Sequence, residues 1–125
     1  MRLLLDTHVV LRLLANDKRV AHLHERILSE ENEVFVSAAT WWELAIKVGI
    51  GKLEVDVAEL RQAARLSGFM ELPVLGVHAE HLRGLEAIHK DPFDRLLVAQ
   101  ANAEPMRLLT SDAQLAGYGA NIEVI

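Results

Sequence analysis

Four acidic residues are spaced along the chain so that a fold of alternating strands and helices would bring them together: Asp6, Glu43, Asp94 and Asp112. Carboxylate oxygens are the ligands that hard divalent cations such as Mg²⁺ or Mn²⁺ prefer. Such a cation activates water and bridges to phosphate oxygens, which would let an acidic protein act on nucleic acid.

Charge repulsion is the physical reason to expect a cation at a site of this kind. Two carboxylates about 5 Å apart repel by about 3 kcal/mol at an effective dielectric constant near 20. Three or four in one crevice would cost on the order of 10 kcal/mol, which is comparable with the roughly 5–15 kcal/mol that stabilises a whole domain. A converging cluster must therefore take up protons or bind a cation.

Helix capping is the alternative role for each acid. Thr40 to Glu43 has the form of a capping box, with Glu43 at the third helical position. Asp91 to Asp94 reads as an N-cap aspartate, a proline at the first helical position and an acid that complements the helix dipole. Asp6 and Asp112 are also possible caps, so sequence position alone leaves both roles open.

The elements that must position the acids follow from the apolar pattern. Short continuous apolar runs are typical of strands covered on both faces. The predicted strands are Leu3–Leu5, Val34–Val36, Leu72–Leu75, Arg107–Leu109 and Ile122–Ile125. Helical spacing between them predicts helices around Val20–Ile27, Trp41–Val48, Val57–Ala64 and Phe93–Ala101. This alternation predicts an α/β fold with a parallel sheet flanked by helices.

Pro73 indicates the order of the strands. A proline inside a strand run is confined to a sheet edge, a strand start or a bulge, so the third strand is expected at an edge. An order of 3-2-1-4-5 then places a topological switch point between strands one and four, where open parallel sheets bind ligands. Asp6 and Asp112 would flank that point, and Glu43 and Asp94 would reach it from helix N-termini.

Composition bounds the remaining possibilities. The 125 residues suit one domain, expected to span residues 1–125, and 51% hydrophobic with 25% charged residues excludes a disordered chain. The absence of cysteine excludes disulfides, iron–sulfur clusters and thiol catalysis. A net charge of −5 argues against a polybasic binder of nucleic acid or membrane. No run approaches the roughly 18 apolar residues of a membrane span, and the N-terminal run is too short for a signal peptide, so a cytoplasmic protein is expected.

The segments that carry these acids resemble motifs of the PIN-domain ribonucleases, and within them the VapC toxins of toxin–antitoxin pairs. The resemblance extends over essentially the full length, and four motifs occur in the family's order. They are Leu3–His8, Val36–Lys47, His89–Ala101 and Leu108–Asp112. Arg12 and Ile88 depart from residues frequent in close relatives, which leaves substrate choice and partner fit open.

This resemblance implies a metal-dependent endoribonuclease with the 3-2-1-4-5 sheet. It implies that Asp6, Glu43 and Asp94 hold one or two Mg²⁺ or Mn²⁺ ions, with Asp112 completing the ligand set or orienting the attacking water. It also implies an RNA substrate, a homodimer and a small antitoxin protein that occludes the site.

Polar residues beside the acids have two possible roles. Thr7, Ser37, Thr110 and Ser111 are expected either to hydrogen-bond the carboxylates and bound water or to cap helices. Lys47 stands four residues after Glu43, which favours an ion pair on one helix face, although it could instead contact RNA phosphate. Arg95 has the same two possible roles.

The histidines and tryptophans are expected to be structural. Without an H-E-x-x-H motif or cysteines, surface or core positions are favoured for the six histidines over metal binding. Trp41 is expected in the core, and Trp42 with Ile46 forms a second apolar stripe that would suit a dimer partner or an antitoxin.

Two other functions compete with the ribonuclease. One is an aspartate-based phosphatase with Asp6 as nucleophile, but such enzymes place a second aspartate two residues on, where this chain has His8. The other is a PIN-like interaction module without catalysis. The presence of all four acids does not favour such a module. Metal binding would distinguish it from the ribonuclease, because a module without catalysis could lack Mn²⁺ binding.

Overall fold

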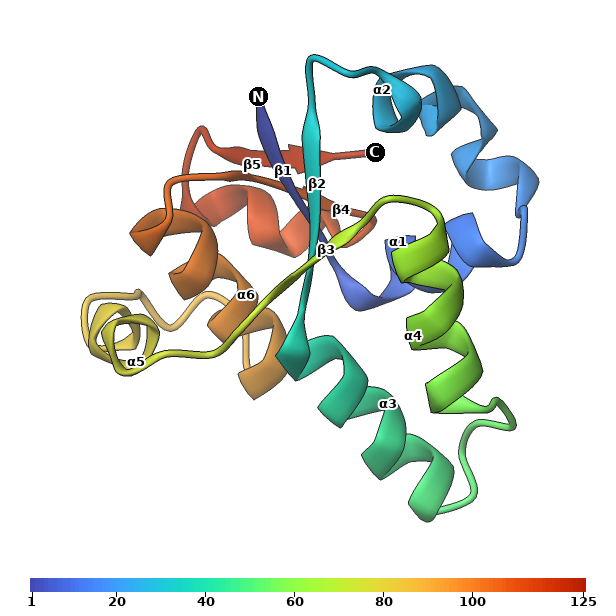
Figure 1. The fold of residues 1–125 in the computed structure, drawn as a ribbon. Coiled ribbons are helices and arrows are strands. Elements are labelled where there is room, and N and C mark those ends of the chain that lie inside the picture. Colours follow the sequence, from blue (N-terminus) through green and yellow to red (C-terminus); the bar gives the residue numbers. More distant parts are fainter.

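Five parallel strands form one sheet in the order β3-β2-β1-β4-β5. Figure 1 draws the fold of this computed structural model, which describes residues 1–125. The strands are β1 (Arg2–Leu5), β2 (Glu33–Ser37), β3 (Met70–Leu72), β4 (Arg107–Thr110) and β5 (Ile122–Val124). The order 3-2-1-4-5 predicted from the sequence is confirmed, so the switch point lies between β1 and β4.

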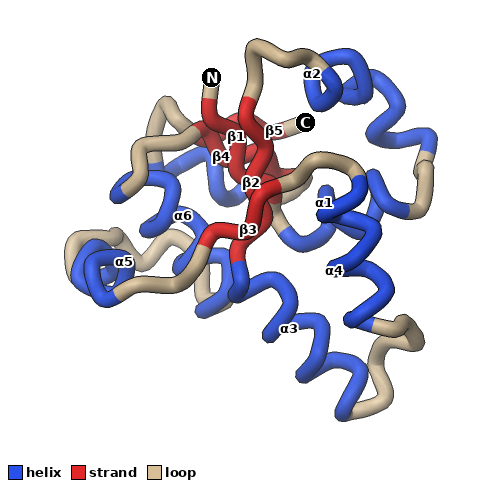
Figure 2. The backbone as a smooth tube through the Cα atoms, viewed as in Figure 1, coloured by secondary structure: helices blue, strands red, loops and turns tan.

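Helices cover both faces of this sheet (Figure 2). They are α1 (Thr7–Leu14), α2 (His24–Leu28), α3 (Ala38–Gly49), α4 (Val57–Leu66), α5 (Gly76–Leu82) and α6 (Pro92–Ala103), with 3-10 segments at Lys18–Leu23 and Ala113–Tyr118. None of these helices has the length and apolar character needed to cross a membrane.

Strand β1 shows why the sheet needs cover on both sides. Successive side chains of a strand point to opposite faces. Leu3 and Leu5 pack into one hydrophobic core, and Leu4 between them packs into a second. All three are fully buried, which explains why the strand is a continuous apolar run.

The edge position of β3 is confirmed, but Pro73 lies outside the strand. The predicted strand Leu72–Leu75 is wrong in its bounds, because pairing with β2 runs from Met70 to Leu72 and stops there. Pro73 has no backbone N–H to donate to a ladder and follows directly. It therefore ends the edge strand.

The capping box that was one of two possible roles for Thr40 and Glu43 does not form. Helix α3 begins at Ala38, immediately after β2, and the hydroxyl of Ser37 accepts the backbone N–H of Ala39 at 3.0 Å. Ser37 is therefore the N-cap, and Glu43 lies in the second helical turn. Its carboxylate is free to contact side chains of other elements.

Five aspartates cap helical segments, and three of them are the possible caps named from the sequence, each of which keeps one oxygen for other contacts. Asp6 caps α1, Asp91 caps α6 and Asp112 caps the 3-10 segment that starts at Ala113. Asp6 directly follows β1, and Asp112 closely follows β4. Capping and a functional role are thus compatible, because one carboxylate oxygen serves the cap.

Candidate metal centre

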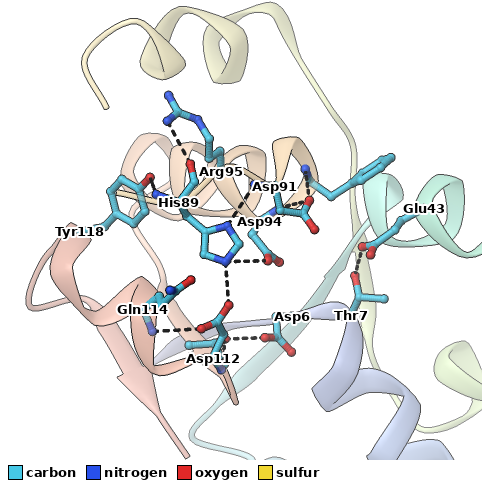
Figure 3. A network of polar contacts seen from close by, with 12 residues as sticks. Asp6, Thr7, Glu43, His89, Asp91, Asp94, Arg95, Asp112, Gln114 and Tyr118 are labelled. Atoms are coloured by element: carbon cyan, nitrogen blue, oxygen red, sulfur yellow. Dashed lines mark hydrogen bonds and ion pairs between the residues drawn. The ribbon is translucent and has the colours of Figure 1, made fainter. Parts of the chain in front are cut away.

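Acidic side chains from separate elements meet beyond the carboxyl ends of β1 and β4. Asp6 follows β1, Asp112 follows β4, and Asp94 lies in the first turn of α6 (Figure 3). Glu43 faces the same region from α3. This is the switch point of the sheet, where parallel α/β folds bind ligands.

Asp6 is held by hydrogen bonds to both of its carboxylate oxygens. The side chain is buried, Oδ1 accepts the Val9 N–H at 2.8 Å, and Oδ2 accepts the hydroxyl of Thr110. The same Thr110 hydroxyl accepts the backbone N–H of Asp112 at 3.0 Å. Burial raises the pKa of Asp6, and the bonds from Thr110 and Val9 lower it only in part.

Asp94 carries the clearest sign of uncompensated negative charge. Burial raises its pKa to about 7, and the carboxylates of Asp91, Asp6 and Glu43 add to that effect. His89 is the one neighbour that opposes the shift. A carboxyl group in this setting is relieved by a proton or by a bound cation.

Glu43 is buried and linked to the first helix. Its Oε1 accepts the Thr7 hydroxyl at 2.7 Å, and the Lys47 ammonium lies 2.9 Å from its Oε2. Thr7 directly follows Asp6, so one short segment orients two of the acids. The predicted ion pair between Glu43 and Lys47 is therefore present.

His89 is the residue of this site that sequence reasoning missed. Its Nε2 lies 2.8 Å from Oδ2 of Asp112 and 3.7 Å from Oδ2 of Asp94. One ligand atom from each of these three residues lies within 4.8 Å of the others, and neither Asp6 nor Glu43 joins this tight group. The available signal was its place two residues before the N-cap Asp91, in the loop that leads into α6.

The hydrogen bonds of His89 define its tautomer. Its Nδ1 accepts the backbone N–H of Asp91 at 3.0 Å, which assigns the proton to Nε2. Nε2–H then donates to Asp112. In this tautomer His89 orients a carboxylate and has no free lone pair for a cation.

The other predicted site residues divide into two groups. Thr7 and Thr110 contact the acids, whereas Ser37 caps α3, and Ser111 bonds Asp6 through its backbone. Arg95 points away from the carboxylates (Figure 3) and donates to the backbone carbonyls of Glu86 and His89. Arg95 therefore braces the loop before α6.

Comparison with known protein families matches residues 3–121 to the PIN domain. The chain belongs to the PIN-domain family. Comparison with curated protein sequences gives no match. The four acids thus lie in a PIN domain, at the end of its sheet beside the switch point between β1 and β4.

The solved structures that share this fold include two VapBC complexes and a further toxin–antitoxin complex. VapBC2 from Rickettsia felis, bound to a DNA fragment from its promoter, has a TM-score of 0.74 and 16% identity, and the match covers 100% of this chain and 98% of that one. A toxin–antitoxin complex from Klebsiella pneumoniae has a TM-score of 0.64 and 22% identity, and the match covers 97% of this chain and 95% of that one. VapBC-1 from nontypeable Haemophilus influenzae has a TM-score of 0.68 and 17% identity, and the match covers 100% of this chain and 97% of that one.

Proposed function

We propose that this PIN domain is a metal-dependent endoribonuclease that hydrolyses RNA phosphodiester bonds. The observation that carries the proposal is the convergence at the switch point of carboxylates that follow β1 and β4 or project from α3 and α6, and this setting raises the pKa of Asp94 to about 7. That repulsion fits a site that a divalent cation completes. The family resemblance of the motifs supports the same chemistry.

Asp6, Glu43, Asp94 and Asp112 are the residues proposed to hold Mg²⁺ or Mn²⁺. Such a cation supplies Lewis-acid chemistry, because it lowers the pKa of water and offsets charge on the phosphate. The all-oxygen donor set suits these hard ions, since carboxylates are their usual protein ligands.

Hydroxyl groups of this chain keep the acids in place for that role. Thr110 donates to Asp6, and Thr7 donates to Glu43, so a hydroxyl group fixes one oxygen of each carboxylate. Asp112 uses one oxygen for the Gln114 N–H and the other for His89. We therefore propose that Asp112 completes the site or orients the attacking water from a fixed position.

The proposed biological role is that of the toxin of a VapC-type toxin–antitoxin pair. Support comes from the full-length fold likeness to chains of VapBC complexes. We propose that a small cognate antitoxin covers the acidic site and that the protein forms a homodimer. Co-purification with a protein encoded beside it would test the antitoxin.

The aspartate phosphatase is less well supported than the ribonuclease. Both oxygens of Asp6 already accept hydrogen bonds, which opposes their use as a nucleophile. His8, at the position of the second aspartate of such enzymes, is exposed. A non-catalytic interaction module remains the alternative. Measurements of metal binding and RNA cleavage distinguish it from the ribonuclease.

Cleavage of a mixed cellular RNA pool tests the proposal directly. Purified protein would be incubated with Mg²⁺, Mn²⁺ or EDTA, beside Asp94→Asn and the matched control Asp56→Asn, whose aspartate caps α4 away from the site. We expect cuts that need metal, that Asp94→Asn abolishes and that Asp56→Asn retains. Equal cutting by wild type and Asp94→Asn would contradict the proposal.

A further inference from the structure

The connection between β3 and α6 is attached to the domain through one buried side chain. Between Leu72 and Leu97 every residue is exposed or half-buried except His78, which is fully buried. His78 lies on α5, which stands at the margin of the molecule beside α6 (Figure 1). A segment with so few buried apolar contacts belongs to the least stable part of a fold. Its attachment therefore depends on the bonds of this histidine.

His78 caps the start of α5 from inside the helix. Leu75 is the N-cap residue, and its side chain makes no capping hydrogen bond. Instead, Nδ1 of His78 accepts the Leu75 N–H at 2.9 Å, as a glutamate or glutamine does in a capping box. The ring proton then lies on Nε2, which donates to Glu104 at the C-terminal end of α6. The neutral ring thus fastens the start of α5 to the end of α6.

The side chain of Gln100 completes this cluster and leaves one buried atom without a partner. Its Nε2 donates to the carbonyl of Pro73 at 3.3 Å and lies 3.4 Å from Nδ1 of His78. Its Oε1 is buried and accepts no hydrogen bond. Both groups that face Nδ1, the Leu75 N–H and the Gln100 amide nitrogen, are therefore donors. That arrangement suits a neutral ring and opposes a second proton on Nδ1.

The charges around His78 decide how the cluster responds to acid. Glu104 is the one carboxylate that bonds the ring, and Arg2 from β1 lies 4.0 Å from the same carboxylate and shares its charge. A second proton costs the fully buried ring its bond from Leu75, and Glu104 offsets only part of that cost. The other ionisable groups of β3 and α5 are exposed and make no bond to the ring: Glu71, Glu80, His81 and Arg83.

We propose that His78 is a proton-operated clasp for the start of α5. When Nδ1 takes up a proton from solvent it becomes a donor, and its bond from the Leu75 N–H breaks. The amide of Gln100 turns so that Oε1 accepts the new proton, and it gives up the carbonyl of Pro73. The charged ring stays on α6 between Gln100 and Glu104, whereas the segment 73–75 loses both of its bonds to the cluster.

Acid therefore releases the connection that leaves β3, together with the exposed apolar side chains of Val74 and Leu75. The end of the same connection is held separately, because the Tyr118 hydroxyl accepts the N–H of His89 and Arg95 donates to its carbonyl. Release is thus confined to the first half of the segment between β3 and α6. This device does not depend on the proposed ribonuclease function.

Amide hydrogen exchange of the full-length chain, followed by NMR between pH 8 and pH 5, tests the proposal. Histidine changes its charge in this range. Every sample would contain EDTA and carry Asp94→Asn, so that titration of Asp94 does not contribute. Once His78 is charged, the protection factor of the Leu75 amide is expected to fall about tenfold per pH unit, because release takes up one proton. Amides of β1 report global unfolding and should keep their protection.

His78→Asn removes the titrating group but keeps an acceptor, because Oδ1 of asparagine lies where Nδ1 of the histidine lies. The protection factor of the Leu75 amide is then expected to become independent of pH. His81→Asn is the matched control, since His81 is an exposed histidine of the same helix, and it should keep the pH dependence. Thermal unfolding of both variants would show that the fold is intact.

Gln100→Glu tests the part that the amide takes. A carboxylate at this place accepts from Nδ1 and favours the charged ring, so the pH midpoint of release should rise by about 1–3 units. A constant protection factor for Leu75 while the ring signal of His78 titrates would overturn the proposal. So would a ring that stays neutral down to pH 5, a joint loss of protection at Leu75 and β1, or an unchanged pH dependence in His78→Asn.

Discussion

His89 donates its Nε2 proton to Oδ2 of Asp112 at 2.8 Å. At its other nitrogen the same ring accepts the backbone N–H of Asp91. One imidazole thus joins the loop that precedes α6 to the residue that follows β4. Because Asp91 caps the helix that carries Asp94, His89 positions two of the acids relative to each other.

Replacement of His89 by alanine is expected to destabilise the fold. It leaves the Asp91 N–H without an acceptor and Oδ2 of Asp112 without its donor in a partly buried site, at a cost of about 1–3 kcal/mol. Urea denaturation measures the loss. The matched control is His81→Ala, since His81 is exposed and bonds only a carbonyl of its own helix. Equal midpoints for the two variants would contradict the positioning role.

The raised pKa of Asp94 predicts how stability depends on pH. Because the folded-state pKa of about 7 lies above the ordinary value of 3.8, the folded protein binds this proton more tightly than the unfolded chain does. The contribution of Asp94 to stability is therefore complete below about pH 4 and is lost as the pH rises through 7. Asp94→Asn removes this dependence.

Thermal unfolding in EDTA at several pH values tests that sign. Asp94→Asn is expected to gain stability relative to wild type as the pH rises from about 4 to 8, because the wild-type carboxylate becomes charged among other acids. Asp56→Asn should show no such gain. If the difference in stability between Asp94→Asn and wild type stayed constant with pH, the pKa of Asp94 would not be raised in the folded protein.

Added Mg²⁺ or Mn²⁺ should stabilise the folded protein through the same carboxylates. Binding to the folded state alone contributes about 2.7 kcal/mol when the free metal is 100 times its dissociation constant. We expect the added metal to raise the unfolding temperature of wild type and of Asp56→Asn. It should not raise that of Asp6→Asn or Asp94→Asn. An equal increase in all four proteins would place the metal elsewhere.

Local patterns predicted most of the fold because buried parallel strands are short apolar runs. Leu3 to Leu5 is such a run, and it lies at the centre of the sheet. The pattern failed at β3, where Met70 and Glu71 are exposed on an edge strand and give no apolar signal. It also failed at α3, since Ser37 and Thr40 both carry hydroxyls and only the length of β2 decides which one caps.

The convergence of Asp6, Asp94 and Asp112 at one end of the sheet could be expected from the sequence, because they lie just after strands or in the first turn of a helix. His89 was not, because its contact with Asp112 spans 23 residues and depends on how the loop before α6 returns to β4. The link from Thr110 to Asp6 spans 104 residues and likewise depends on β1 and β4 lying side by side. Side-chain contacts across the sheet require the fold itself.

The hydroxyl of Thr110 is the shared contact of Asp6 and Asp112, and its removal gives the last prediction. Thr110 is fully buried, so Thr110→Val keeps its shape but leaves the Asp112 N–H without an acceptor and Oδ2 of Asp6 without its hydroxyl donor. The expected loss of stability is about 1–3 kcal/mol.

Loss of that hydroxyl should also change metal binding. The Thr110 bond lowers the pKa of Asp6, so Thr110→Val raises that pKa further and weakens the site for a cation. Thr110→Ser keeps the hydroxyl and loses one methyl group, so it should retain the stabilisation by Mn²⁺ that Thr110→Val loses in part. If Mn²⁺ stabilised Thr110→Val and Thr110→Ser equally, Thr110 would support the sheet and have no role in metal binding.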